Sequence, residues 1–591
     1  MLKQVLGVIL TSTAISAMAG KVELVGANGS YKLLRDGKEY FIEGAGGGGS
    51  KALLAELGGN SFRTWGSEKA KEELDEAQKY GQTVTIGHWL GHSMHGFDYT
   101  NKKQLEKQKA DVLQMVRKNK NHPALLMWAL GNEMEIGNPH QEGMWKHINE
   151  LAILVKKEDP NHPVMTVIAE IPTDKVKAIH KYCPDVDIIG INTYGGSGSI
   201  PERWRKAGGT KPYVITEFGP PLNSEWWRKT KYGCPFEMTS TEKAKWYYDV
   251  YQSTVIADKG KLCLGSYAFT WGYKVEATPT WYGLLLPDGT VLGAAQALQK
   301  AWGNTRSKNF APEISEVKIS AHDGVTPADL LTASVTASDS DGDKLTWNWV
   351  LVDEAADYGV FGTGLPIPPG HEGCIVAGQG TSEVQVRVPG GGKYRLYVYC
   401  FDGNGNAAYA NHPINAKGAA PKRETPAPAM PVYVYAEGEE TLWYPTGYMG
   451  NTGSISVDGK STENPRTGST CMKVSYMAKD NWVGVQWQNP PNDWGDKPGG
   501  YNLSKAKTLS FYARGKYGEE KVSFYAGGMS KAKYGDTDKV EKKDIILTRE
   551  WKKYYIPLEG SDFSHIKTGF GFVFGGQGAP VIFYLDDIKY E

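Results

Sequence analysis

Two glutamates, Glu133 and Glu217, each stand at the end of a short apolar segment. Asn132 precedes the first in ALLMWALGNE, and a glycine follows shortly after the second in PYVITEFG. An apolar run of this length, closed by turn residues, predicts a strand buried on both faces. Two carboxyl groups flanking one glycosidic bond are the minimal apparatus for its hydrolysis. The first hypothesis is therefore acid–base chemistry on a sugar, provided that the fold brings the two glutamates together.

The surrounding elements decide whether these glutamates meet. Residues 21–303 alternate short apolar strands with amphipathic helices, as in EKAKEELDEAQKYG followed by TVTIGHWLG. Eight such units in a segment of this length match a (β/α)8 barrel in number and size. A doubly wound parallel sheet is the alternative, but it does not need eight units, and its dinucleotide fingerprint is absent from the sequence. We therefore predict an α/β fold, a TIM barrel, over residues 20–303.

In a barrel of this kind the active site lies at the C-terminal ends of the strands. Polar and aromatic residues occupy these positions after the second to the eighth predicted strand. They are Arg63, Trp65, His88, Trp89, Asn132, Glu133, Glu170, Asn192, Tyr194, Glu217 and Trp271. The two glutamates follow the fourth and the seventh strand, so they face each other across the barrel mouth. A lone glutamate at a strand end is more often a structural group than a catalyst, so the prediction depends on the pair and its companions.

Four motifs of this region resemble the retaining glycoside hydrolases of clan A: FRTWG, GNE, TEFG and FTWG, after the second, fourth, seventh and eighth strands. The family 2 barrel is similar because its eighth strand is often followed by a pattern like WYGLLLPDGT. Secreted endo-β-1,3-glucanases with an immunoglobulin-like domain behind the barrel are an equally good likeness. The resemblance covers residues 21–303. The order of domains departs from family 2, whose β-domains usually precede the barrel.

The resemblance implies that Glu133 is the acid/base and that Glu217 is the nucleophile. Glu133 must be protonated to give its proton to the leaving oxygen, so apolar neighbours such as Trp128 are expected to raise its pKa. Glu217 must be ionised to attack the anomeric carbon, and Arg63 is the cation that could keep it so. The chemistry of the residues is thus consistent with the implied roles.

Five further residues are expected to support the reaction. Tyr194 would donate its phenolic hydrogen to the nucleophile, and Asn132 would bond the sugar 2-hydroxyl, a contact that tightens in the transition state. Trp271 would offer a flat floor for the sugar at the cleavage site. His88 and Trp89 would line the donor subsites. This chemistry requires no metal and no cofactor in the barrel.

Other residues of the barrel allow competing interpretations. Glu43, Glu135 and Glu170 are also carboxylates, and we interpret Glu135 as a substrate-loop or surface group. GHWLGHSMHGFDY holds three histidines, but no helical register or nearby carboxylate supports a zinc site. GGGGSK lacks the Gly-Lys-Ser/Thr order of a phosphate loop. Trp226 and Trp227 form either an acceptor platform or part of the packing.

Beyond the barrel the sequence becomes strand-rich. Residues 312–415 alternate between turns and predict an immunoglobulin-like β-sandwich, in which Cys374 and Cys400 are expected to pair. DSDGD at 339–343 is interpreted as a hairpin turn, because it does not fit the spacing of an EF-hand calcium loop. Residues 416–431 are rich in Pro and Ala and predict a semi-rigid linker.

The last segment, residues 432–591, is strand-rich and very aromatic. It resembles the jelly-roll carbohydrate-binding modules, and this resemblance implies a structural calcium near Glu437 and Asp586. Exposed aromatic rings would stack on sugars, although packing in the core is the default for most of them. A binding domain on a linker suits a polymeric substrate, because tethering raises the local concentration of polymer at the cleft.

Composition and the N-terminus limit the partners and the location. The 591-residue chain has no formal net charge, which argues against a nucleic-acid or membrane-surface partner. Residues 1–19 combine one lysine, a short apolar stretch and Ala-Met-Ala, a pattern typical of a secretory signal peptide. We therefore expect a secreted protein, exported to the periplasm or outside the cell. We also expect it to be a monomer.

Together these features predict a retaining β-glycoside hydrolase that acts on a polysaccharide by double displacement. A β-glucan, β-1,3-linked first, is the expected substrate, and this linkage rests only on architectural analogy. Galactans and mannans remain open. The alternatives are a transglycosylase that acts on the same class of substrate and a polysaccharide-binding protein whose barrel has lost its catalytic activity.

Overall fold

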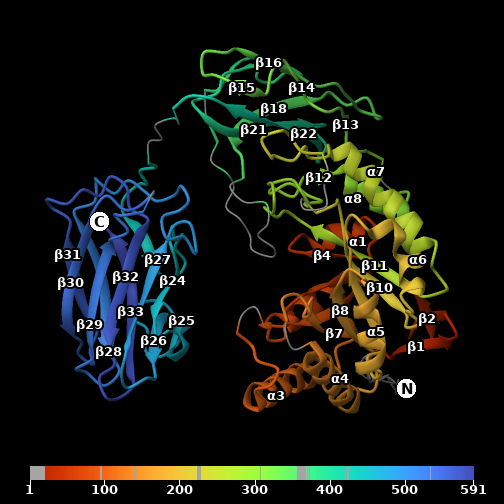
Figure 1. Ribbon diagram of the computed structural model, residues 1–591, viewed down its shortest axis with the longest axis horizontal. Coiled ribbons are helices and arrows are strands. Elements are labelled where there is room, and N and C mark those ends of the chain that lie inside the picture. Colours follow the sequence, from red (N-terminus) through yellow and green to blue (C-terminus); the bar gives the residue numbers. More distant parts are fainter. Residues whose placement is uncertain are drawn as a thin grey trace, which may run out of the picture. The chain divides into compact units, whose positions relative to one another are not determined.

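The computed structural model describes residues 20–93, 96–138, 141–222, 228–306, 308–355, 373–419, 425–532 and 534–591, together with Tyr358, Pro368, Gly370, His371 and Pro421. The chain forms two compact units, residues 1–421 and 422–591. In Figure 1 the first unit runs from red to green and the second is blue. The first unit contains a barrel and a β-sandwich.

Eight parallel strands close into a barrel in the order β4 to β11. Their cores are buried on both faces, as in β7 with its run LLMWAL, because helices cover the outside of the barrel (Figure 1). The strands are β4 (Ile42–Gly47), β5 (Ser61–Arg63), β6 (Thr83–His88), β7 (Leu125–Asn132), β8 (Val164–Ala169), β9 (Ile188–Asn192), β10 (Tyr213–Phe218) and β11 (Cys263–Trp271). The predicted α/β fold with a TIM barrel is confirmed.

Three helices, α1, α3 and α7, begin after a residue whose side chain caps the first turn. α3 begins after Asn101, whose side chain accepts hydrogen bonds from the amides of Lys103 and Gln104. α7 begins with a capping box formed by Thr239 and Glu242. The helices are α1 (Lys51–Glu56), α2 (Ala70–Lys79), α3 (Lys102–Asn119), α4 (Gln141–Glu158), α5 (Thr173–Tyr182), α6 (Ile200–Lys206), α7 (Ser240–Val250), which continues as the π-helix η3 (Tyr251–Ile256), and α8 (Gly293–Ala301).

An antiparallel sheet of three short strands precedes the barrel: β1 (Val22–Ala27), β2 (Ser30–Arg35) and β3 (Lys38–Tyr40). It lies against the N-terminal ends of the barrel strands, where the amide of Val22 donates to the carbonyl of Asn161 and that of Tyr31 to Lys261. Its apolar side chains join residues of the barrel interior in one core cluster. This sheet therefore covers the end of the barrel opposite the mouth.

The β-sandwich of the first unit has two main sheets. One contains β18 (Thr346–Asp353), β21 (Gly392–Phe401) and β22 (Asn406–Ala416), with β12 (Val291–Leu292) and β15 (Asp323–Val325) paired to β22. The other contains β14 (Lys318–Ile319), β16 (Leu331–Ser334), β19 (Ile375–Ala377) and β20 (Glu383–Val386), and a separate pair joins β13 (Glu313–Ile314) to β17 (Ala337–Ser338). Buried Trp349, Leu396 and Val384 belong to the core between them. The immunoglobulin-like assignment stays a prediction.

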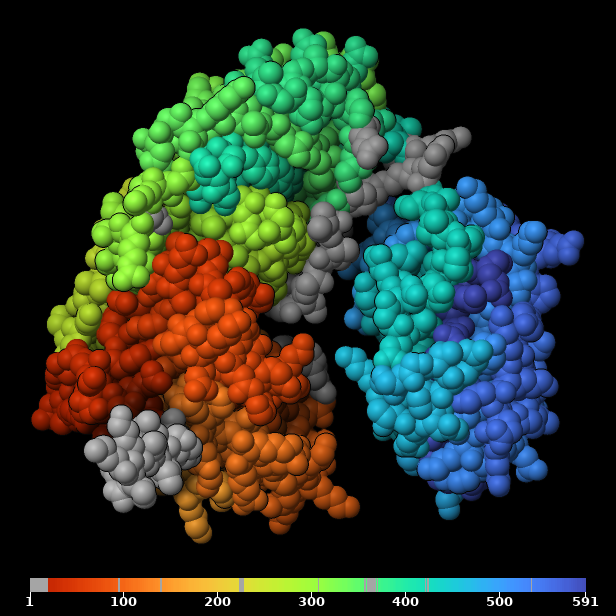
Figure 2. Space-filling model, turned by 180° about the vertical axis from the view of Figure 1, so that it is seen from behind, coloured from red at the N-terminus to blue at the C-terminus, as the bar shows by residue number. Residues whose placement is uncertain are grey.

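The barrel and the sandwich share a sheet. β12 precedes α8 within the barrel segment, and its Val291 and Leu292 pair with Asn406 and Ala407 of β22. Figure 2 shows the green sandwich residues packed directly on the yellow-green residues of the barrel. The first unit is therefore one continuous body.

The second unit is a sandwich of two antiparallel sheets. One sheet contains β23 (Val432–Tyr435), β25 (Ile455–Ser461), β26 (Cys471–Tyr476), β28 (Thr508–Gly515), β31 (Lys552–Pro557) and β33 (Val581–Tyr590). The other contains β24 (Tyr444–Gly450), β27 (Trp482–Gln488), β29 (Lys521–Gly527), β30 (Lys539–Ile546) and β32 (Thr568–Gly575). Phenylalanines fill the space between them, and Phe511, Phe524 and Phe570 lie in mutual ring contact.

All six cysteines are free and buried, so the expected pairing of Cys374 with Cys400 is wrong. Cys400 lies in β21, whereas Cys374 precedes β19 in the opposite sheet, and both act as small apolar packing groups of the sandwich core. Burial raises the pKa of the Cys400 thiol to about 12.

Among the described residues, no helix is long and apolar enough to cross a membrane.

Candidate active site

Three side chains converge on Glu217, near the end of β10. Arg63 Nη1 lies 3.0 Å from its Oε1, and Trp65 Nε1 lies 2.6 Å from the same oxygen. The hydroxyl of Tyr194 donates to Oε2 over 2.7 Å. Glu217 itself is 7% exposed. Because all three groups donate, this set satisfies a carboxylate and fixes its orientation.

Glu133 directly follows β7 in a backbone conformation that non-glycine residues seldom adopt, with a φ of 54°. Its amide donates to the carbonyl of Val167 over 2.9 Å, and its own carbonyl accepts from His92 Nε2 at 3.0 Å. Its Oε1 accepts from Asn192 Nδ2 at 2.8 Å. Backbone strain of this kind persists only where neighbours enforce it, and it is concentrated at functional sites.

Two asparagines link the glutamates. Asn132 Oδ1 accepts from Arg63 Nη2 at 2.7 Å and from Asn192 Nδ2 at 3.1 Å. Asn192 Oδ1 in turn accepts from the hydroxyl of Thr216 at 2.8 Å. Since Arg63 also binds Glu217 and Asn192 also binds Glu133, one hydrogen-bonded network joins the ends of β5, β7, β9 and β10. The barrel thus brings together the pair that the sequence places far apart.

The pKa of Glu133 is raised to about 7, by burial and then by the negative charge of Glu217, and the hydrogen bond from Asn192 opposes the rise. The protonated form is therefore well populated at neutral pH. Burial is the predicted cause, but Trp128 is not the neighbour that provides it, because Trp128 is fully buried in the core around the barrel and its Nε1 donates to Asp159 Oδ2 at 2.8 Å. Successive side chains of a barrel strand point alternately to the barrel interior and to the surrounding helices. Trp128 is one of the side chains that point to the helices.

A cluster of aromatic rings packs behind Tyr194. Its ring centroid lies 5.5 Å from that of Tyr282 and 6.0 Å from that of Phe269. Phe269 contacts Tyr282 at 5.3 Å and Trp65 at 5.9 Å, and Trp281 belongs to the same cluster. Burial, followed by the charge of Glu217, raises the pKa of Tyr194 well above its usual value, so its hydroxyl keeps its proton. These rings hold two of the three donors of Glu217.

The structure brings Arg63 and Tyr194 into contact with Glu217, as predicted, and Asn132 bonds Arg63 within the same network. Sequence reasoning placed Trp65 and Asn192 at strand ends but gave neither a role. Each bonds a glutamate directly. The available signal was their position, because Trp65 lies two residues after Arg63 and Asn192 ends its strand.

Trp271 does not form the predicted sugar floor. It is fully buried, its Nε1 donates to the carbonyl of Ser50 over 2.9 Å, and its ring lies against Gly49 of the loop after β4. Two other predicted residues have no described hydrogen bond to either glutamate. His88 Nδ1 is 2.7 Å from the hydroxyl of Ser67, and burial lowers the pKa of its imidazole, while Trp89 is 50% exposed.

The other carboxylates near the mouth have their own partners. From the sequence we interpret Glu135 as a substrate-loop or surface group. It is buried, which contradicts a place on the surface, and its Oε1 lies 2.6 Å from Lys175 Nζ. Glu170 pairs with Arg203 at 2.8 Å. Glu43 lies near the start of β4, away from the mouth end of that strand, and burial raises its pKa. His95, the last of the three histidines of GHWLGHSMHGFDY, lies outside the described residues, as do Trp226 and Trp227 of the possible acceptor platform.

The residues expected to hold a calcium ion in the second unit already accept hydrogen bonds. Glu437 accepts from the amides of Ser469 and Thr470, and Asp586 accepts from those of Arg466 and Thr467.

In the described part of the chain, one cluster of acidic side chains is close enough together to share a cation. It comprises Asp339, Asp343 and Asp402 in the first unit, and it includes two residues of the DSDGD turn.

Both units match known families. Residues 52–258 match the TIM barrel domain of glycosyl hydrolases family 2, and residues 432–591 match carbohydrate binding domain 30. The barrel is thus similar to that of the family 2 glycosidases, and the matched residues include the pair of strand-end glutamates. The resemblance to that family is supported for the barrel, and the second unit is similar to a carbohydrate-binding domain.

The curated relatives that match include several β-glucuronidases. That of Chlorocebus aethiops is 32% identical over 142 residues, which are 24% of this chain and 20% of that protein. That of Paenibacillus borealis is 29% identical over 190 residues, 28% of this chain and 30% of that protein. The chain thus spans less than a third of the length of these relatives. A solved β-glucuronidase from Dictyoglomus thermophilum aligns with a TM-score of 0.38 and 18% identity, covering 48% of this chain and 53% of that one.

Proposed function

We propose that the barrel is a retaining β-glycoside hydrolase, with Glu217 as the nucleophile and Glu133 as the acid/base. The observation that carries this assignment is the contrast between the two carboxyl groups. Glu217 is held by three donors, whereas Glu133 has a pKa raised to about 7. An oriented anion suits attack on carbon, and a carboxyl group that is protonated near neutral pH suits proton transfer.

The proposed reaction has two displacements. In the first, Glu217 attacks the anomeric carbon, the bond to the leaving oxygen breaks, and Glu133 gives that oxygen its proton. In the second, ionised Glu133 takes a proton from water, which attacks the same carbon and releases Glu217. Asn132 uses its Oδ1 on Arg63 and Asn192, so its amide nitrogen is the group that would meet the sugar 2-hydroxyl.

The names of the matching relatives make a β-glucuronide the first substrate to test. They give no support to the β-glucan prediction. One observation keeps a neutral sugar as the second candidate. A glucuronide carries a carboxylate that needs a cation, and the cations described at the barrel mouth have acidic partners: Arg63 with Glu217, Lys175 with Glu135, Arg203 with Glu170 and Lys274 with Glu276. A neutral β-glucan makes no such demand.

A product assay tests the function and separates the substrates. The wild type would be incubated with aryl β-glucuronide, aryl β-glucoside, β-1,3-glucan, galactan and mannan, and the anomeric form of the first product followed by NMR. We expect one class to be cleaved with retained configuration. Inverted configuration, or no product from any glycoside, would contradict the proposal. Transfer to added acceptors in place of hydrolysis would favour the transglycosylase.

We further propose that residues 432–591 bind the polysaccharide on which the barrel acts. Two neighbouring strands of one sheet, β24 and β27, carry the exposed rings of Tyr444, Tyr448 and Trp482. Exposed aromatic rings provide flat apolar surfaces for the faces of sugars. We also propose export through residues 1–19, a monomeric state and a structural calcium near Glu437 and Asp586.

Replacing Trp482 with alanine is expected to weaken binding to the insoluble form of the preferred polysaccharide by about tenfold or more, because a 52% exposed indole is lost. Turnover of a soluble aryl glycoside should not change. Tyr555→Ala is the matched control, since Tyr555 is 48% exposed on β31 of the other sheet. A pull-down isotherm measures both variants, and equal losses would place the binding face elsewhere.

A further inference from the structure

Glu237, in the loop between β10 and α7, joins three parts of the first unit. Its side chain is fully buried and lies 2.5 Å from Lys243 Nζ of α7. The hydroxyls of Thr278 and Thr280, in the loop after β11, donate to it over 2.7 and 2.8 Å. Asn411 of β22 donates to it over 2.9 Å. The loop after the last barrel strand is thus attached to the sandwich through one carboxylate.

The sandwich makes a second attachment at the same loop. The hydroxyl of Tyr409, in β22, donates to the carbonyl of Thr280 over 2.8 Å, and Lys243 Nζ donates to both that carbonyl and the Tyr409 oxygen. Arg395 of β21 supports Asn411 with a 2.7 Å bond and also donates to the carbonyl of Pro235. Tyr409 and Arg395 are each 1% exposed.

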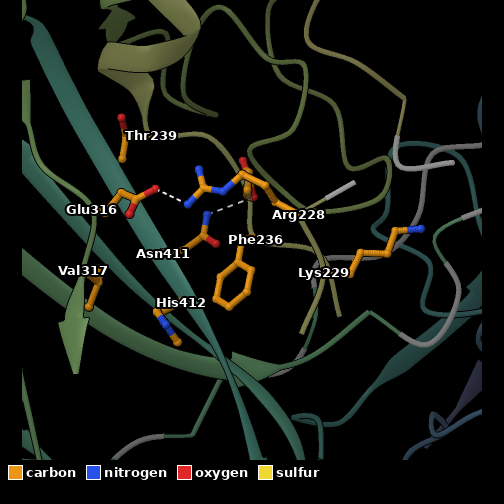
Figure 3. A pocket seen from close by; sticks show the side chains of 9 residues that line it. Arg228, Lys229, Phe236, Thr239, Glu316, Val317, Asn411 and His412 are labelled. Carbon is orange, nitrogen blue, oxygen red and sulfur yellow. Dashed lines mark hydrogen bonds and ion pairs between the residues drawn. The ribbon is translucent and has the colours of Figure 1, made fainter. Parts of the chain in front are cut away.

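The surroundings of this contact can be followed in Figure 3. Asn411 and His412 of β22 line a cavity of about 460 Å³ together with Arg228, Phe236 and Thr239 of the barrel. Arg228 pairs with Glu316 at 2.5 Å on the same side (Figure 3). The sandwich therefore meets the barrel through specific polar contacts as well as apolar packing.

The attached loop leads directly to the aromatic cluster of the active site. Thr280 is followed by Trp281 and Tyr282, which are 2% and 3% exposed. Tyr282 lies against Tyr194, and Trp281 Nε1 donates to the carbonyl of Pro221, four residues after Glu217. A continuous series of close contacts thus runs from β22 of the sandwich to the tyrosine that orients Glu217.

We propose that Tyr409 of the sandwich is a positioning residue for the reaction of the barrel, acting through Thr280 and the Trp281–Tyr282 pair on Tyr194. This inference rests on the proposed function, because its effect is on the nucleophile. The physical basis is close packing: interiors leave little free volume, so a shift of the Thr280 carbonyl displaces the rings behind it. A misplacement of about 1 Å at reacting groups costs on the order of 100-fold in rate.

The Tyr409→Phe variant tests this inference, because it removes one hydroxyl and keeps the ring. We expect kcat per active site to fall about tenfold while KM stays within about twofold, since the substrate-binding surface is unchanged. Tyr394→Phe is the matched control. Tyr394 is 2% exposed in β21, and its hydroxyl donates to the carbonyl of Gly390 within the sandwich. The melting temperature of both variants should fall by similar amounts, and only Tyr409→Phe should lose kcat.

A double-mutant cycle with Tyr194→Phe gives the second measurement. If Tyr409 acts through Tyr194, its substitution should reduce kcat about tenfold in the wild type and less than about twofold in the Tyr194→Phe background. The rate of covalent trapping of Glu217 by an activated 2-deoxy-2-fluoro glycoside should follow the same pattern, because trapping measures the nucleophile directly.

The outcomes separate this inference from the proposed function. If the wild type hydrolyses a glycoside but Tyr409→Phe keeps the kcat of Tyr394→Phe, the positioning role is wrong and the function stands. Equal losses in both Tyr194 backgrounds would also overturn it, because Tyr409 would then act by another route. If the wild type cleaves no glycoside and is not trapped, the proposed function fails and this inference fails with it.

Discussion

Glu217→Gln is expected to lose glycoside hydrolysis by on the order of 10⁴-fold, with the fold intact. Glutamine fills the same space, but its amide cannot form the covalent bond to the anomeric carbon. Arg63, Trp65 and Tyr194 would then face one acceptor oxygen in place of two. The measurement is kcat/KM on the preferred aryl glycoside, with intact-mass detection of the trapped fluoroglycosyl enzyme in the wild type and its absence in the variant.

Glu170→Gln is the matched control for this experiment. Glu170 also follows a barrel strand at the mouth, has a positive φ of 49° and is paired with a cation, Arg203. Because it contacts neither Glu133 nor Glu217 in any described hydrogen bond, we expect its activity to stay within a few-fold of the wild type. If Glu217→Gln remained as active as this control, the nucleophile would be another residue.

Glu133→Gln should reduce the rate on substrates with poor leaving groups by about 10²- to 10⁴-fold, the usual contribution of general acid catalysis. The loss should be much smaller for dinitrophenyl glycosides in the first displacement, because their leaving oxygen needs no proton. In the wild type, kcat/KM should fall as the pH rises through about 7, because burial and Glu217 raise the pKa of Glu133 to about 7 and only its protonated form donates. A pH profile of both proteins measures this.

The variant should show no such decrease around pH 7, since glutamine does not titrate. A decrease that persisted at the same pH in Glu133→Gln would assign the titration to another group. An equal loss on good and poor leaving groups would mean that Glu133 acts on something other than the leaving oxygen. Either result would remove it from the role of the acid.

The barrel and the glutamate pair were predictable because both depend on local signals. Apolar runs such as that of β7 mark strands buried on both faces, and in a barrel every strand ends at the same mouth. Arg63, Asn132 and Tyr194 follow from the same rule. Strand position does not reveal how deeply a side chain is covered, so Trp271 was misassigned: the loop at Gly49 and Ser50, distant in sequence, covers its ring.

The packing of the barrel and the sandwich into one unit was not predictable from the sequence. The sequence predicts a barrel over residues 20–303 and a sandwich over residues 312–415, separated by a polar, proline-containing stretch. The contacts that cross it join residues far apart in the chain, such as Glu237 with Asn411 and Val291 with Asn406, and none leaves a local pattern. The same reason explains the cysteine error, because spacing along strands does not fix which sheet a thiol faces.

The three-stranded sheet at the closed end of the barrel has a consequence for the order of folding. The hydroxyl of Ser30 donates to the carbonyl of Gly260, a contact between residues 230 positions apart. During synthesis this sheet is made early, but its partner near Lys261 emerges only when the last barrel strand is being made. Contacts of such high sequence separation form late and slow the folding of a chain. Barrel closure is therefore a late event, and until then the first strands depend on other contacts to avoid aggregation.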